Sequence, residues 1–168
     1  FRRLFGDERT DYSASLRRHY EQGPPPNWQR SFVSAYASAH PWEDWAETWA
    51  QYLHMVDALQ TVQAVGLALT PLRLDDPTLE TRLNPGVAES FDQMLARWFP
   101  LSYMLNNLHR SLGMPDGYQF TLGETVIGKL RFVHDLIAAG VSPPAPLAPL
   151  APSALPVIAP VPAAGALE

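Results

Sequence analysis

The distribution of proline constrains this chain more than any other feature of its sequence. Eight of the 17 prolines lie between residues 142 and 168, among alanine, leucine and valine. Proline is excluded from helix interiors and lacks a backbone donor, and the small side chains between these prolines bury little surface. The pattern predicts a disordered, partly polyproline tail over residues 141–168. A single globular domain is then expected over residues 1–140, which is long enough to bury a core.

Within that domain helical periodicity is common and strand signals are scarce, so the expected fold class is mainly α. Gly23 and the three prolines after it stop the first helix. Asn27 is placed to cap a second helix, and Pro100 is expected to kink or restart a later one. The run Thr121-Leu-Gly-Glu124 is typical of a capping box. The expected helices span residues 7–20, 27–36, 41–65, 87–99 with a continuation to 112, and 121–139.

The composition argues against several classes of partner. The formal net charge of -5 leaves no basic surface, so a nucleic acid is not expected. No apolar run reaches the roughly 18 residues of a membrane helix, so no membrane is expected either. The chain has no cysteine and therefore no thiolate metal site. It begins with Phe1 inside a helical pattern, so we expect either a processed protein or a fragment.

The segment of residues 34–54 contains the candidate functional residues. Pro41 suits the first position of a helix, because its missing N–H has no partner there. At about 100° per residue Glu43 and Glu47 fall on one stripe, beside an apolar face. Two glutamates four residues apart repel each other by roughly 0.2–0.5 kcal/mol, and a nearby metal ion would offset this. The apolar face is expected to consist of Trp42, Trp45, Ala46, Trp49, Leu53 and Val56.

A purely structural interpretation of the same segment stays open. Glu43 is the third residue of the expected helix, where glutamate favours the helix dipole and capping. A Glu-x-x-x-Glu pair is common on solvated helices and is a weak metal motif by itself. His40 before a proline is typical of a helix entry, and the tryptophan stripe is typical of a core. Spacing alone therefore does not decide between a metal ligand and an ordinary helix.

Four stretches of the sequence are distinctive: Leu4-Phe-Gly-Asp-Glu-Arg9, the tryptophan-rich run Phe32–Ala50, Leu105–Asp116 and Val126–Ile137. Together they resemble a known family, the putative zinc-binding metallopeptidases of bacteria. The resemblance implies an upstream His-Glu-x-x-His helix and, further upstream, a zinc ribbon. Neither is present, and the five histidines at 19, 40, 54, 109 and 134 are nowhere spaced as that motif.

The resemblance also implies roles for three residues. By analogy with gluzincins, Glu43 is the third zinc ligand and Glu47, one turn further, orients a ligand histidine. Tyr36, seven residues before Glu43, is placed like a tyrosine that stabilises the tetrahedral oxyanion. Tyr36 as a plain core tyrosine, and Glu47 rather than Glu43 as the ligand, stay open.

Two hypotheses follow. In the first, the chain is the C-terminal helical part of a zincin that, when whole, holds Zn²⁺ and hydrolyses peptides in the bacterial cytoplasm. In the second, it is a non-catalytic helical interaction or remnant protein without metal. Catalytic zinc needs three protein ligands, so the chain as given is expected to bind zinc weakly or not at all and to be inactive. Apolar surface beside Trp42, Trp45 and Trp49 is expected to favour self-association.

Overall fold

The computed structural model describes residues 1–70, 78–79, 89–119 and 122–140. The described part is helical, as predicted, and its only β pairing is one isolated antiparallel bridge between Leu69 and Leu79. The predicted tail over 141–168 and most of the connection before α4 lie outside the described residues. In chain order the elements are α1 Arg2–Phe5, α2 Tyr12–Gln22, two 3-10 turns η1 Trp28–Arg30 and η2 Tyr36–Ser38, α3 Pro41–Ala64, α4 Phe91–Ser111 and α5 Glu124–Gly140.

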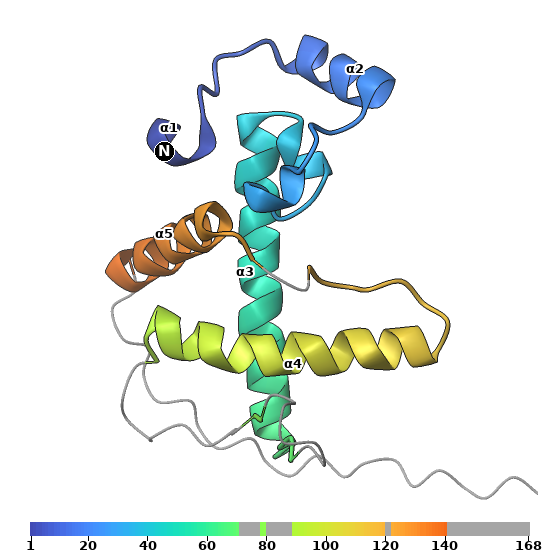
Figure 1. Ribbon diagram of the computed structural model, residues 1–168. Coiled ribbons are helices and arrows are strands. Elements are labelled where there is room, and N and C mark those ends of the chain that lie inside the picture. The colour runs from blue at the N-terminus through green and yellow to red at the C-terminus, as the bar shows by residue number, and fades with distance from the viewer. Residues whose placement is uncertain (71–77, 80–88, 120–121, 141–168) are drawn as a thin grey trace, which may run out of the picture.

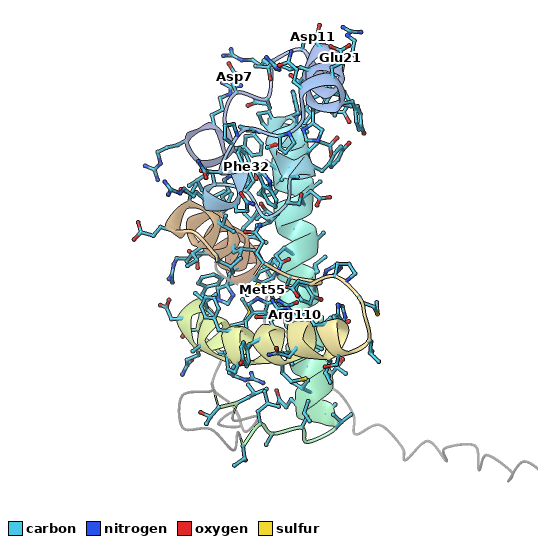
Figure 2. The ribbon with its side chains drawn as sticks, turned by 45° about the vertical axis from the view of Figure 1, so that its right-hand side comes forward. Asp7, Asp11, Glu21, Phe32, Met55 and Arg110 are labelled. Atoms are coloured by element: carbon cyan, nitrogen blue, oxygen red, sulfur yellow. The ribbon has the colours of Figure 1, made fainter. Side chains whose placement is uncertain are left out.

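Helix α3 is the axis around which the other elements are arranged (Figure 1). Helix α4 crosses α3 toward its C-terminal end, and α5 lies beside the middle of α3. Helix α1 and the turn η2 pack at the N-terminal end of α3. Met55, which is fully buried, lies where α4 crosses α3 (Figure 2). No helix in the described ranges is both long and apolar enough to cross a membrane.

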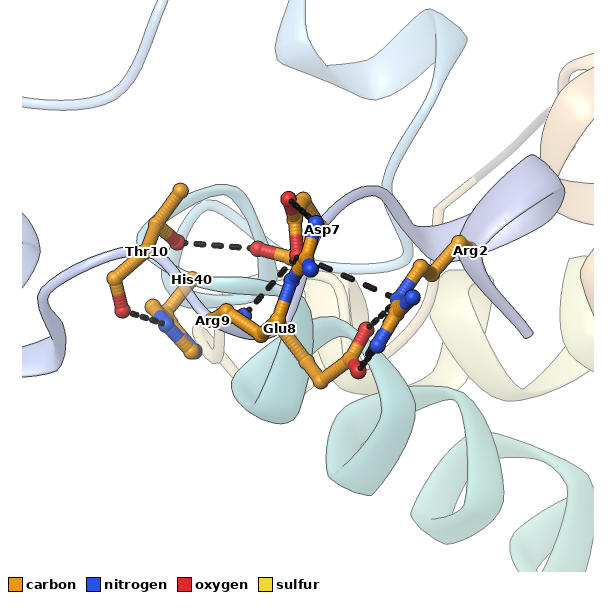
Figure 3. Close-up of polar contacts among 6 residues, drawn as sticks. All are labelled: Arg2, Asp7, Glu8, Arg9, Thr10 and His40. Carbon is orange, nitrogen blue, oxygen red and sulfur yellow. Dashed lines mark hydrogen bonds and ion pairs between the residues drawn. The ribbon is translucent and has the colours of Figure 1, made fainter.

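The predicted helix over 41–65 is confirmed, and its beginning is firmly held. Pro41 occupies the first turn and His40 is the N-cap, whose Nδ1 accepts the Trp42 N–H at 3.1 Å. Since Nδ1 is an acceptor, the ring proton is on Nε2, which donates to the carbonyl oxygen of Thr10 at 3.0 Å (Figure 3). The chain before α2 is thereby tied to the start of α3.

The first predicted helix begins later than expected. Asp11 caps α2, and its side chain accepts the Ala14 N–H at 2.9 Å. The residues before it form a polar turn instead, where Asp7 pairs with Arg9 and Glu8 pairs with Arg2 (Figure 3). These short-range ion pairs are exposed and add little stability, because water screens them.

The predicted helix over 27–36 is wrong. Asn27 does not cap a helix; its φ of 58° is left-handed and its side chain makes no capping bond. Two short 3-10 turns stand in place of the helix, with an irregular segment between them. The carbonyls of Ser31, Phe32 and Val33 accept hydrogen bonds from side chains far along the chain. Those carbonyls therefore have partners without helical bonds.

Helix α4 runs from Phe91 to Ser111 with Pro100 inside it. Of the two outcomes predicted at Pro100, a kink or a restart, the restart is therefore wrong. Its start is a complete capping box between Ser90 and Gln93. The residues on both sides of the proline are held by the core, since Trp98 and Leu101 are each 1% exposed. Burial against neighbouring helices offsets the backbone hydrogen bond that proline removes.

The predicted apolar face of α3 is wrong in part. Trp42 and Leu53 are 53% and 52% exposed, and Trp45 and Trp49 lie only at the margin of the core. The side of α3 that faces the core is not the side that carries the tryptophans. Its buried residues are Asp44, Thr48, Tyr52, Met55, Leu59 and Val62.

A buried ion pair explains why this side begins with a carboxylate. Lys129 of α5 lies 2.6 Å from Asp44, from Nζ to Oδ2, and the two side chains are 2% and 1% exposed. Burial raises the pKa of Asp44 from 3.8 to about 6, against the lowering effect of Lys129. No pattern in the sequence of α3 alone could reveal a partner 85 residues away.

The raised pKa of Asp44 gives a pH prediction. The folded state binds a proton at Asp44 more tightly than the unfolded state, whose pKa is near 3.8. The contribution of Asp44 to the free energy of unfolding is therefore largest below pH 4 and falls as pH rises to about 6. Urea unfolding of the wild type and of Asp44→Asn across this range should show a more negative slope with pH for the wild type. Parallel slopes would contradict the assignment.

A close backbone approach at Gly123 gives a stability prediction. A Cβ added to Gly123 would lie 2.4 Å from the carbonyl oxygen of Arg30. Gly123→Ala should lower the free energy of unfolding by about 1–3 kcal/mol, because two backbones would have to separate. Gly128→Ala on α5 is the control, since a Cβ there meets nothing within 4 Å. Equal melting temperatures for the two variants would contradict this packing.

Candidate functional site

Glu43 lies in the first turn of α3, where it is half-buried beside α2. The Tyr12 hydroxyl donates to its Oε1 at 2.5 Å. The ring of Tyr12 packs against His40, the N-cap of the same helix, at 5.1 Å between centroids. Helix α2 therefore fixes the orientation of the Glu43 carboxylate. Sequence reasoning missed Tyr12, because nothing local to it indicates a partner 31 residues away.

Tyr36 belongs to the turn η2, and the structure brings it to Glu43. Burial, followed by hydrogen bonding to Glu43, raises the pKa of Tyr36 above its ordinary value of 10. The hydrogen bond to Glu43 likewise raises the pKa of Tyr12. Both phenols are consequently protonated at neutral pH and can donate. The ring of Tyr36 also contacts His19 of α2 at 5.9 Å between centroids.

Glu47 lies one turn further along α3 and has a different partner. The Ser34 hydroxyl donates to its Oε2 at 2.9 Å and accepts the Ala37 N–H at 3.0 Å. The same hydroxyl thus joins Glu47 to the turn that carries Tyr36. The two glutamates are held by separate donors, which offsets part of their mutual repulsion.

Among the described residues, the histidines do not form a metal site with Glu43. His40 uses both ring nitrogens in the contacts at the start of α3. His109 and His134 have partners elsewhere, the Pro115 carbonyl and the Tyr52 hydroxyl. In the part of the chain that the structure describes, no three His, Cys, Asp or Glu side chains are grouped so that they could hold a metal ion. Among the described residues, Glu43 is therefore not part of a complete metal site.

Two hollows flank this end of the molecule. One, of about 300 Å³, lies along α2 and is lined by Ser15, Arg18, His19, Gln22, Gly23, Pro25, Ser38 and Ala39. The other is more open, has about 660 Å³, and is lined by Phe1, Arg2, Glu8, Trp42 and Trp45. The second hollow includes Trp42 and Trp45 of α3, whereas neither hollow is lined by Glu43 itself.

Comparison with known proteins identifies the family of the chain. Residues 1–136 match the family described as "Putative zinc-binding metallo-peptidase". The chain belongs to this family. The resemblance seen in the sequence is thereby confirmed, and it covers every element from α1 through most of α5.

Curated relatives of the chain are considerably longer than the chain itself. Three uncharacterized proteins, one from Mycobacterium bovis and two from strains of Mycobacterium tuberculosis, are each 47% identical over 137 residues. The match covers 82% of this chain but only 38% of each relative. No solved structure matches the chain.

Proposed function

We propose that this chain supplies the third zinc ligand, Glu43, of a zinc metallopeptidase that hydrolyses peptides in the bacterial cytoplasm. The His-Glu-x-x-His ligands of such a site do not occur in these 168 residues. They would come from a longer form of the protein, comparable in extent to the curated relatives. The observation that carries the proposal is Glu43 itself: a half-buried carboxylate in a zinc-binding family, oriented by a tyrosine from another helix.

The surroundings of Glu43 fit a zinc ligand. Carboxylate oxygen is one of the three ligand types of catalytic zinc, and ligating carboxylates are themselves hydrogen-bonded. Tyr12 supplies that hydrogen bond. When bound, zinc lowers the pKa of a water molecule to about 7 and so provides a nucleophile for the peptide carbonyl. Glu43 as a lone carboxylate does not hold catalytic zinc, so the proposal requires ligands from elsewhere.

Glu47 and Tyr36 complete the proposal. Glu47 would accept a hydrogen bond from the far nitrogen of a ligand histidine and so fix the ring, while Ser34 holds Glu47 in place. Tyr36 would donate to the oxyanion that forms when the carbonyl is attacked. The contact of Tyr36 with Glu43 supports this role, because it holds the hydroxyl beside the proposed ligand.

The role of Tyr36 can be separated from that of the ligand. In the longest form of the protein isolated from its source cells, Tyr36→Phe should lower kcat by about 10²–10³. Zinc content should stay at one equivalent per chain, because the hydroxyl is not a ligand. Tyr20→Phe is the control on α2, since that ring is 72% exposed. A Tyr36→Phe protein that retains full kcat would exclude the oxyanion role.

The intact mass of the native protein identifies which form to use. A mass well above the 18.7 kDa of this chain would indicate that the remaining ligands are carried on the same polypeptide. A mass of 18.7 kDa would favour a helical protein that acts without its own zinc site and binds other molecules.

A further inference from the structure

The segment between η1 and η2 carries Ser34 and leads into Tyr36, yet it has little secondary structure of its own. Its backbone carbonyls are held by two distant side chains. Lys129 Nζ of α5 donates to the Ser31 carbonyl at 2.6 Å. Gln119 Nε2 donates to the carbonyls of Phe32 and Val33 at 2.9 and 2.5 Å. The position of the segment therefore depends on these two donors.

The same ammonium group also holds α3. Lys129 Nζ bonds Asp44 Oδ2 at 2.6 Å, and Asp44 directly follows Glu43 in the first turn of that helix. The ring of Phe32 covers the ammonium at 4.4 Å, and Phe32 lies beside α5 (Figure 2). One buried cation thus joins the helix that carries Glu43 to the segment that leads to Tyr36.

We propose that Lys129, assisted by Gln119, is a positioning residue that sets the placement of Tyr36 relative to Glu43. The inference rests on the proposed function only for the roles of Tyr36 and Glu43; the contacts themselves are independent of zinc. A buried ion pair is often no more stabilising than an apolar pair of similar volume. An apolar pair could fill the space, but it could not bind the Ser31 carbonyl and α3 together.

Hydrogen–deuterium exchange on this chain, without metal, tests the proposal. In the double variant Lys129→Met/Asp44→Asn the amides of residues 31–39 should exchange about 10- to 100-fold faster, as expected for loss of hydrogen bonds to a charged group. The slowest amides of α4 should exchange at the wild-type rate, because they report opening of the whole fold. Arg131→Met is the control on α5, since Arg131 pairs with Asp92 at the surface.

Three outcomes of the exchange experiment distinguish a positioning role of Lys129 from other roles. Faster exchange confined to residues 31–39 supports the positioning role. Unchanged exchange at residues 31–39 would overturn the proposal, because Lys129 would then have no effect on the segment. Equal acceleration in α4 would also overturn it, because Lys129 would then stabilise the whole fold in general. Gln119→Leu repeats the test with a half-buried residue should the double variant not fold. It should accelerate the same residues selectively, and unchanged exchange in Gln119→Leu would also overturn the proposal. None of these results depends on whether Glu43 binds zinc.

Discussion

Lys129→Met should lower the free energy of unfolding by about 3–5 kcal/mol at pH 8, because it leaves the Asp44 carboxylate buried without a partner. Asp44 and Lys129 side chains are 1% and 2% exposed, so water cannot replace the lost contact. Native proteins are stable by only about 5–15 kcal/mol, and this single change would remove much of that. Urea unfolding monitored by circular dichroism measures the effect.

The pH dependence of this loss in stability distinguishes an effect of the buried charge from an effect of lost packing. Burial already raises the pKa of Asp44 to about 6, and without Lys129 it should rise further. At pH 5 the carboxyl is then neutral, so the loss in Lys129→Met should be smaller than at pH 8. Lys129→Met/Asp44→Asn should recover most of the stability at both pH values. An equal loss at pH 5 and pH 8, with no recovery in the double variant, would show that packing rather than charge is responsible.

Glu43→Ala should weaken zinc binding by more than about 100-fold in the longest native form of the protein. Loss of a group that only orients a ligand costs about 10–100-fold, and loss of a ligand should cost more. Peptidase activity should fall with the zinc content, since the metal activates the attacking water. Competition with a chelator of known affinity measures the change.

Two matched variants complete that experiment. Glu47→Gln should weaken zinc binding by about 10–100-fold, in keeping with an orienting role. Glu21→Gln, on the exposed surface of α2, should change nothing. Unaltered zinc affinity in Glu43→Ala together with loss in Glu47→Gln would move the ligand role to Glu47.

The sequence predicted those elements whose stability is mainly local. The helix at 41–65 has a proline at its start and a glycine after its end, and the structure contains it as α3 with nearly the same bounds. The helix at 27–36 failed because Lys129 and Gln119 bind carbonyls of that segment. The predicted apolar face of α3 failed in part, because the buried side of the helix begins with Asp44, which pairs with Lys129. In these two failures the deciding partner lies at least 85 residues away along the chain.

The candidate site likewise contains residues that the sequence predicted and residues that depend on distant parts of the chain. The spacing of Tyr36, Glu43 and Glu47 is short-range, and the structure places Tyr36 against Glu43. Tyr12 could not be predicted, because its role depends on how α2 folds back onto α3. Ser34 lies within the segment of residues 34–54 that the sequence analysis singled out. Its hydroxyl reaches Glu47 only because of the turn between Ser34 and α3. The zinc roles of Glu43, Glu47 and Tyr36 stay predictions.

Anomalous diffraction at the zinc edge, on crystals of the longest native form of the protein, would show whether Glu43 binds zinc. We expect a single zinc peak with a Glu43 carboxylate oxygen at about 2.0–2.2 Å and two histidine nitrogens at about 2.0–2.1 Å. Tyr12 should still donate to the Glu43 carboxylate. A zinc peak bonded to Glu47, or one coordinated without any residue of α3, would contradict the account.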